Sequence, residues 1–199
     1  MKIIRTAEIY DIIYKVGDVV EFELTTGEKV RMIAVNQKRD MMEFCLAECL
    51  SARYQMNSRD TNEGGFEESL LRRILNEEII QTFPREIYDK MVPFDNGDYL
   101  SIPTEEQIFG KNIYGEPITD DSTEQWDIMK QTKNRIALQG LAGATTWYWL
   151  RNKSVRSASD FCNVNNNGNA NNNGASNSNG VRPYFHLHYR GTMYFGRVN

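Results

Sequence analysis

Apolar and polar residues alternate along the beginning of the chain with the period of two that half-buried β-strands show. The alternation runs through residues 18–24 and again through residues 29–35, and residues 25–28 between them contain a glycine suited to a tight turn. This pattern predicts a β-hairpin. Residues 42–46 continue the same period, so we expect a third strand that extends the hairpin into a meander. The apolar faces would carry Val20, Phe22, Leu24, Val30, Met32, Ala34, Met42, Phe44 and Leu46.

The middle of the chain changes to a helical period. Residues 67–81 carry apolar side chains at the spacing of one helix face. Glu67 and Glu68 fall in the first turn, where acidic side chains favour the helix dipole. Arg72 and Arg73 would face solvent. The spacing therefore predicts an amphipathic helix over residues 67–81.

Prolines and capping motifs predict three shorter helices. Pro84 suits the start of a helix, and Pro93 would end it. Residues 104–107 and 122–125 each begin with threonine or serine and have glutamine three positions later. This is the capping-box pattern, in which each of the two side chains bonds to the backbone N–H of the other residue. We therefore expect short helices near these three places.

The last third of the chain is strand-like again. Residues 147–151 are aromatic and apolar, and residues 184–189 and 193–198 flank a glycine-containing turn. The second pattern predicts a terminal hairpin.

Together these patterns predict one α+β domain over residues 1–199. A chain of this length with 40% hydrophobic and 11% aromatic residues can bury a substantial core. N-terminal strands would occupy residues 1–60, and a helical part would occupy residues 66–135. Short strands joined by long loops would occupy residues 140–199.

Charge and hydropathy narrow the classes of partner. The formal net charge is −4, and Lys and Arg are scattered along the chain, so we expect no nucleic-acid partner. Residues 1–6 lack the apolar core of a signal peptide, and no apolar run reaches membrane-spanning length. We therefore expect cytoplasmic synthesis without a signal peptide, and no membrane insertion.

Candidate catalytic groups are few. Cys45, Cys49 and Cys162 are an odd number without the spacing of a disulfide framework, so we expect reduced, buried thiols. No second Cys or His pair would complete a zinc site. His186 and His188 would share one face of a strand, and an outer-face position is favoured over a metal site because no partner carboxylate is evident. We expect no catalytic residue, no metal, no cofactor and no enzymatic activity.

The most unusual segment is an asparagine tract, because nine of the sixteen residues 165–180 are asparagine. Three interpretations are open. Such a tract is typical of low-complexity disorder, since asparagine and glycine cannot build a core. It also suits a structured loop, since asparagine tolerates left-handed backbone and bonds to its own main chain. The third interpretation is a binding surface whose composition is set at the DNA level.

The residues around the tract resemble variable proteins that diversity-generating retroelements rewrite in bacteria and their phages. The resemblance rests on residues 147–151 (WYWLR), 157–165 (SASDFCNVN) and 180–183 (GVRP), and residues 16–22 and 68–72 agree with it. These proteins have a C-type-lectin-like fold, related to that of formylglycine-generating enzymes. The resemblance therefore implies this fold, with an N-terminal hairpin or meander, a helical middle, and C-terminal short strands with long loops.

In such systems a reverse transcriptase makes errors at adenines of a template repeat. Asparagine codons hold two adenines and a final pyrimidine, so these errors reach many side chains but never a stop codon. The resemblance implies that the tract and nearby residues form an exposed, variable ligand-binding surface. That surface would consist of Tyr148, Asn152, Lys153, Arg156, Asp160, Asn163, Asn165, Asn166, Asn167, Asn169, Asn171, Asn172, Asn173, Asn177 and Asn179.

A fixed scaffold would hold this surface, with Trp147, Trp149, Arg151 and Arg182 as its members. We expect Arg182 to anchor the far end of the tract by hydrogen bonds to backbone carbonyls, which lysine could not make as well. Tyr148 would point away from both tryptophans in a strand, and hence to the surface.

The resemblance implies a noncatalytic, hypervariable protein that recognises a protein or glycan on a cell or phage surface, with no calcium ligand set in its loops. The alternatives are a phage or bacterial structural domain, or a degenerate enzyme of the formylglycine-generating-enzyme-like fold, with an asparagine and glycine loop that is not diversified. Formylglycine generation needs a cysteine pair in the C-terminal half, where only Cys162 lies. Display by a homo-oligomer or a virion would strengthen weak single-site binding through avidity.

Overall fold

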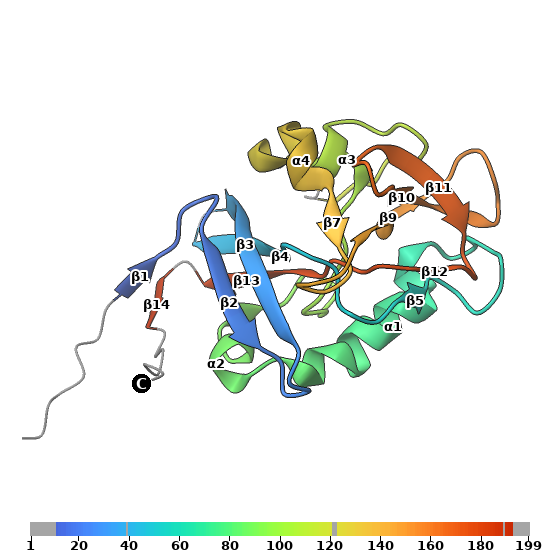
Figure 1. Cartoon of the computed structure of the whole chain (residues 1–199). Coiled ribbons are helices and arrows are strands. Elements are labelled where there is room, and N and C mark those ends of the chain that lie inside the picture. The colour runs from blue at the N-terminus through green and yellow to red at the C-terminus, as the bar shows by residue number, and fades with distance from the viewer. Residues whose placement is uncertain (1–10, 39, 121–122, 189, 193–199) are drawn as a thin grey trace, which may run out of the picture.

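The computed structural model describes residues 11–38, 40–120, 123–188 and 190–192. Figure 1 shows a mixed α/β fold in which strands form a curled sheet and are mostly antiparallel. The predicted combination of strands and a few helices is confirmed. In the described part of the chain, no helix is long and apolar enough to cross a membrane.

The largest sheet has five strands in the order β2-β3-β4-β13-β6. They are β2 (Val19–Glu23), β3 (Lys29–Lys38), β4 (Met41–Leu46), β13 (Tyr184–His188) and β6 (Met91–Val92). The first three strands form the predicted meander. The C-terminal strand β13 pairs with β4 on one side and with β6 on the other. It therefore joins β6 to the meander, and the five-stranded sheet is complete only when β13 is in place.

The predicted helix over residues 67–81 is divided into three pieces. They are a 3-10 turn (Phe66–Glu68), α1 (Leu70–Glu77) and a second 3-10 turn (Ile79–Thr82). The first break falls at Ser69, whose backbone is extended and whose hydroxyl accepts a hydrogen bond from the Arg72 N–H at 3.0 Å. The apolar spacing continues across this cap. Periodicity alone therefore predicts one long helix where the structure has a short α-helix between two 3-10 turns.

Arg72 also differs from its expected position. Its Nε lies 2.5 Å from a carboxylate oxygen of Asp98, so it forms an ion pair with the loop after β6 instead of facing solvent freely.

Two of the three short helices are where the sequence places them. α2 (Arg85–Tyr88) follows Pro84, and α3 (Glu105–Phe109) carries a complete capping box. The stretch before Pro93 ends as strand β6 rather than as helix. The predicted start of the next helix, Ser122, lies outside the described residues.

The segment after Ser122 is helical, but it begins later than predicted. A 3-10 turn (Asp127–Lys130) starts after Trp126 and is followed by α4 (Thr132–Arg135). No side chain caps the start of the 3-10 turn.

A second sheet has three strands in the order β11-β10-β9, formed by β11 (Ala170–Gly174), β10 (Asp160–Val164) and β9 (Tyr148–Lys153). Three further strand pairs complete the fold: β1 (Asp11–Ile13) with β14 (Arg190–Thr192), β5 (Tyr54–Gln55) with β12 (Ser178–Asn179), and β7 (Ala137–Leu138) with β8 (Thr145–Thr146). β14 thus pairs with β1, and the other half of the predicted terminal hairpin, residues 193–198, lies outside the described residues.

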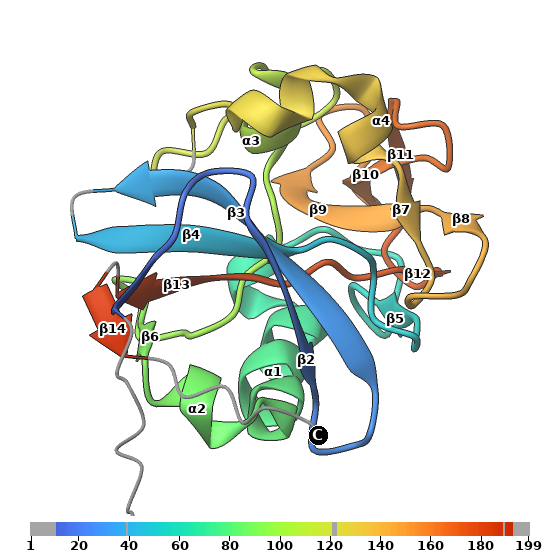
Figure 2. The ribbon, with the colours of Figure 1, turned by 60° about the vertical axis from the view of Figure 1, so that its left-hand side comes forward.

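Two hydrophobic clusters fill the molecule, one on each side of the five-stranded sheet. Figure 2 shows α1 and α2 on one side, and α3, α4 and the second sheet on the other. Five strands, β3, β4, β9, β10 and β13, supply residues to both clusters. In β4, for example, Phe44 belongs to the first cluster and Cys45 to the second, and in β9 Trp149 belongs to the first and Tyr148 to the second. These strands are therefore covered on both faces.

The capping box of α3 gives a test of local stability. The Thr104 hydroxyl accepts a hydrogen bond from the Gln107 N–H at 3.1 Å, and the Gln107 amide oxygen accepts one from the Thr104 N–H at 2.9 Å. We expect Thr104→Ala to lower the free energy of unfolding by about 1 kcal/mol, as loss of an N-cap usually does. Urea unfolding would measure it, with Thr104→Ser as the control that keeps the hydroxyl. Equal losses for both variants would contradict the role of the cap.

Candidate ligand-binding surface

Most of the asparagine tract is a β-hairpin. β10 and β11 pair in antiparallel register, with Asn163 opposite Asn171, and the turn between them spans residues 165–169. The Asn165 side-chain oxygen accepts hydrogen bonds from the Asn167 N–H at 2.9 Å and the Asn169 N–H at 3.0 Å. The expected long loop is therefore an ordered strand and turn. The Asn165 side chain stabilises the turn by bonding to the main chain of the turn residues that follow it.

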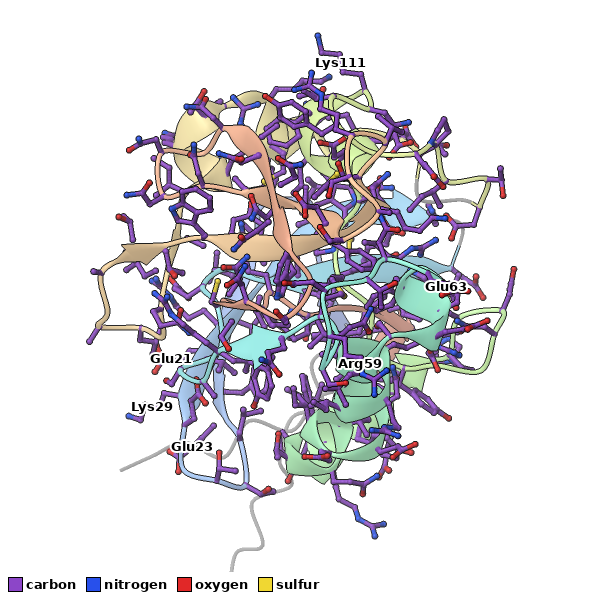
Figure 3. The ribbon with its side chains drawn as sticks, turned by 90° about the vertical axis from the view of Figure 1, so that its right-hand side faces the viewer. Glu21, Glu23, Lys29, Arg59, Glu63 and Lys111 are labelled. Carbon is purple, nitrogen blue, oxygen red and sulfur yellow. The ribbon has the colours of Figure 1, made fainter. Side chains whose placement is uncertain are left out.

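Four asparagines of the tract are exposed: Asn166, Asn167, Asn169 and Asn177. No hydrogen bond within the described residues involves the side chains of the first three. Figure 3 looks onto this side of the molecule, where the loop carrying Arg59 and Glu63 lies below the hairpin. The hairpin thus presents amide groups that the fold itself does not use.

Close packing holds the tip of the hairpin on α4. Gly168 has a φ of +78°, and a Cβ placed there would lie 2.9 Å from the Thr132 carbonyl oxygen and 3.2 Å from the Ile136 side chain. Only glycine fits this combination of backbone angle and close approach. The position of the tip is therefore set by helix α4.

The loop of residues 57–62 holds the base of the hairpin. One Asp60 carboxylate oxygen accepts hydrogen bonds from the Ser176 N–H at 2.9 Å and the Ser176 hydroxyl at 2.7 Å. The Asn62 amide donates to the carbonyl oxygens of Ser157 at 2.8 Å and Asp160 at 3.0 Å. Sequence reasoning missed both anchors, because neither residue lies in a recognisable motif.

Two asparagines expected on the exposed surface are buried. Asn163 has 0% of its surface exposed because it lies on the central strand β10, which is covered on both faces, and neither of its amide atoms has a partner among the described residues. Asn179 is buried beside β5, and its oxygen accepts a hydrogen bond from Asn173 at 3.4 Å. Neither side chain can contact a ligand on the surface of this structure.

Asn152 was also expected to be exposed, and this is wrong. It is 1% exposed and accepts a hydrogen bond from the Glu105 N–H at 2.8 Å. Its Nδ2 group lies within hydrogen-bond distance of Glu106 Oε2 at 3.2 Å, Asn112 Oδ1 at 3.1 Å and the Glu116 carbonyl oxygen at 2.9 Å. Asn152 therefore ties β9 to α3 and to the loop that follows it.

Tyr148 is buried as well, contrary to the expected surface position. Its hydroxyl donates to the Arg135 carbonyl oxygen at 2.9 Å, and it lies against Arg182. A strand covered on both faces has no outward side, so alternation does not place Tyr148 at the surface. The unbroken apolar run around it was the available signal, because continuous runs are typical of fully buried strands.

Arg182 makes hydrogen bonds to backbone carbonyls of the kind expected from the sequence. It is 2% exposed, and its Nε donates to the Leu46 carbonyl oxygen at 3.0 Å, while an Nη group donates to the Asn134 carbonyl oxygen at 3.5 Å and the Tyr148 hydroxyl at 3.3 Å. A planar guanidinium can reach several acceptors in different directions, which a lysine ammonium on a flexible stem cannot do as well.

The other expected scaffold residues differ in burial. Trp149 is fully buried, and its indole N–H donates to the Tyr54 carbonyl oxygen at 2.8 Å. Trp147 has 36% of its surface exposed, so it is not a core residue. Arg151 forms an ion pair with Asp120 near the surface.

The remaining expected surface residues lie around the hairpin. Lys153 is half-buried and pairs with Glu116 at 3.0 Å, and the exposed Arg156 lies with its guanidinium 4.2 Å from the centroid of the Tyr114 ring. The half-buried members of the hairpin and its flank are Asp160, Asn165, Asn171, Asn172 and Asn173. Asn172, for example, donates to Asp160 Oδ2 at 3.1 Å. Several tract asparagines therefore bond to the scaffold.

A second polar cluster lies beside a cavity of about 420 Å³ at the end of the main sheet. Glu43 is buried, with one oxygen 3.1 Å from the Lys38 Nζ and 3.2 Å from the His186 Nε2, and the other accepts from the Trp126 indole N–H at 3.1 Å. His186 is thus buried, not on an outer face, whereas His188 is exposed. The described residues contain no group of three or more potential metal ligands.

This cluster predicts a pH dependence. Burial by itself raises the pKa of Glu43, but the bonds from His186 and the charge of Lys38 outweigh burial and hold the pKa below its usual value. The ionised carboxylate therefore stabilises the fold fully above the unfolded-state pKa of about 4.3, and this contribution is lost as the pH falls through the lower folded-state pKa. We expect Glu43→Gln to be less stable at neutral pH and to lose less stability on acidification. Urea unfolding of the original protein and the variant, from neutral pH down through the folded-state pKa of Glu43, would measure both differences. If the variant lost as much stability on acidification as the original protein, the role of Glu43 would be contradicted.

Buried and exposed asparagines should differ in how much their substitution lowers the stability of the fold. Asn152→Ala removes a buried amide with four hydrogen bonds, so we expect a loss of about 3 kcal/mol in the free energy of unfolding. Asn166→Ala is the matched control at an exposed position, and we expect a change within about 0.5 kcal/mol. Chemical denaturation would compare them. Similar losses would show that the exposed amides also support the fold.

Comparison with known proteins gives a family but no activity. No curated protein and no solved structure is significantly similar to the chain. A family model described as a domain of unknown function, DUF6273, matches residues 42–189, which extend from β4 past the end of β13 and include the whole hairpin. This match covers well over half of the 199 residues, and the chain belongs to the DUF6273 family.

Proposed function

We propose that this protein is a noncatalytic ligand-binding protein with a C-type-lectin-like fold, whose hairpin surface a retroelement diversifies. It would recognise a protein or glycan on a cell or phage surface. The proposal starts from the resemblance of residues 147–151, 157–165 and 180–183 to such variable proteins.

One observation carries the proposal furthest: the exposed asparagines are separate from the contacts that hold their hairpin. The tip rests on α4 through Gly168, and the base is held by Asp60 and Asn62. The side chains of Asn166, Asn167 and Asn169 are exposed and make no hydrogen bond within the described chain. Substitution at these three positions would therefore change the surface and leave the fold intact, which a diversified binding site requires.

The proposed variable surface is narrower than the one expected from sequence. Its centre is the exposed turn, Asn177 lies at the other end of β11 near the base of the hairpin, and Lys153 and Arg156 lie at its margin. The buried residues Tyr148, Asn152, Asn163 and Asn179 are not part of it.

The environment of the cysteines supports a noncatalytic role. Burial raises the pKa of Cys45 to about 11 and of Cys49 to about 12, and it also raises the pKa of Cys162. Nucleophilic cysteines act as thiolates and usually have a lowered pKa. These three thiols stay protonated at neutral pH and fit the role of small core residues.

High affinity at this surface would come from the larger side chains that diversification introduces in place of asparagine. Short amides make adaptable hydrogen bonds but supply little of the aromatic contact that dominates most interfaces. A homo-oligomer or a virion would add avidity to weak single sites. We include such multivalent display in the proposal.

A genomic comparison tests the proposal directly. We expect a near-identical repeat of the segment encoding residues 147–183 close to this gene, together with a reverse transcriptase gene. Differences between the two copies should fall at template adenines and concentrate in the codons of Asn166, Asn167 and Asn169. The codons of Trp149 and Phe161 serve as the internal control and should match. A missing repeat, or differences spread over all four bases, would refute diversification by a retroelement.

A further inference from the structure

The strand β11 lies at an edge of its sheet. The strand order is β11-β10-β9, so β10 covers only one side of β11, which runs along the outside of the molecule in Figure 1. An edge strand presents unpaired backbone N–H and C=O groups to which another chain can add a strand. A protein with such an edge needs a feature that prevents this pairing.

The register shows which backbone groups of β11 face outward. Asn171 lies opposite Asn163 and Asn173 lies opposite Phe161. The hydrogen bonds from the Asn165 N–H to the Asn169 carbonyl and from the Ala175 N–H to the Ser159 carbonyl continue this register beyond both ends of the strand. Hydrogen-bonded pairs alternate in an antiparallel ladder. The backbone groups of residues 171 and 173 therefore bond to β10, and those of residues 170, 172 and 174 point away from it.

Two of these three outward N–H groups, those of residues 172 and 174, are used within the chain. The Asn172 N–H donates to the side-chain oxygen of Asn171 at 2.8 Å, and the Gly174 N–H donates to the side-chain oxygen of Asn173 at 3.0 Å. The outward carbonyl of Gly174 accepts a hydrogen bond from the Asn177 N–H at 3.0 Å. Local bonds of this kind compete with ladder bonds for the same backbone groups.

We propose that Asn171 and Asn173 guard this edge, because each side-chain oxygen occupies the outward N–H that a second copy of the chain would need to extend the sheet. Each guard is the residue immediately before the N–H it covers. Asparagine suits this position because its acceptor is close to the backbone and carries no charge. The inference rests on register and hydrogen bonds alone, so it holds whether or not a retroelement diversifies the tract.

A second copy is the partner against which the edge needs protection. β11 has the sequence Ala-Asn-Asn-Asn-Gly, without charge or proline, and asparagine-rich strands of this kind pair with their own sequence. Two β11 strands related by a twofold axis would present identical surfaces to each other, which gives a closed dimer. Capping the outward N–H groups removes two donors from each strand of that pairing.

A double substitution tests the guard. We expect Asn171→Ala with Asn173→Ala to associate more strongly than the original protein, with a dimer dissociation constant at least about tenfold lower in sedimentation velocity. Asn171→Gln with Asn173→Gln keeps the amide but moves its oxygen away from the N–H, and it should associate in the same way. Asn166→Ala with Asn167→Ala is the matched control at exposed positions, and it should sediment like the original protein.

Two outcomes would overturn the proposal. One is a folded double variant that associates no more strongly than the original protein. The other requires no variant: the caps predict slowed amide hydrogen exchange at Asn172 and Gly174 in the original protein, and exchange there at the rate of an unprotected peptide would show that the caps do not form. The second measurement decides the question even if the double variants fail to fold. Neither result bears on whether a template repeat lies beside the gene.

Discussion

The structure depends on strands that are buried on both faces. β4 and β13 in the main sheet, and β9 and β10 in the second sheet, each send alternate side chains into the two hydrophobic clusters. Phe185 and Tyr184, adjacent in β13, belong to different clusters. Because one strand supplies both clusters, neither can form alone, and the helices, both sheets and the end of the chain must assemble together. Burial of apolar surface on both faces supplies most of the stabilisation that this arrangement needs.

Such strands bring polar groups into the interior. Several of these groups have partners there, although the amide of Asn163 has none among the described residues. Asn152 and Arg182 donate to carbonyl and carboxylate groups where the second sheet meets α3 and the main sheet. At the other end of the main sheet, the Glu43 carboxylate lies among Lys38, His186 and Trp126. A buried polar group without a partner costs about 1–3 kcal/mol, so these bonds also select one packing among many similar ones. They hold together the sheets and helices that support the hairpin.

This support, together with the contacts of Asp60 and Asn62, is what allows an asparagine-rich segment to be ordered. The same residue type performs three tasks within one hairpin: Asn165 forms the turn, Asn171 and Asn173 cap edge N–H groups, and Asn166 and Asn167 face solvent. Only the last group is free to change without a structural cost. If the surface is diversified, the structural asparagines limit where variation is tolerated, and changes at the two edge positions would also affect association between copies.

Local features of the fold are determined by the sequence. The alternation in β2, β3 and β4, the proline before α2 and the capping box at Thr104 depend on neighbouring residues, and all appear as predicted. Single-helix periodicity over residues 67–81 missed the cap at Ser69 because the apolar spacing continues through it. Arg182 was predictable because guanidinium chemistry suits several carbonyl partners. What the sequence could not decide is which asparagines are buried, since Asn163 and Asn166 are the same residue three positions apart. Only the tertiary structure covers both faces of β10 and leaves the turn uncovered, because burial depends on which distant segments pack against each position.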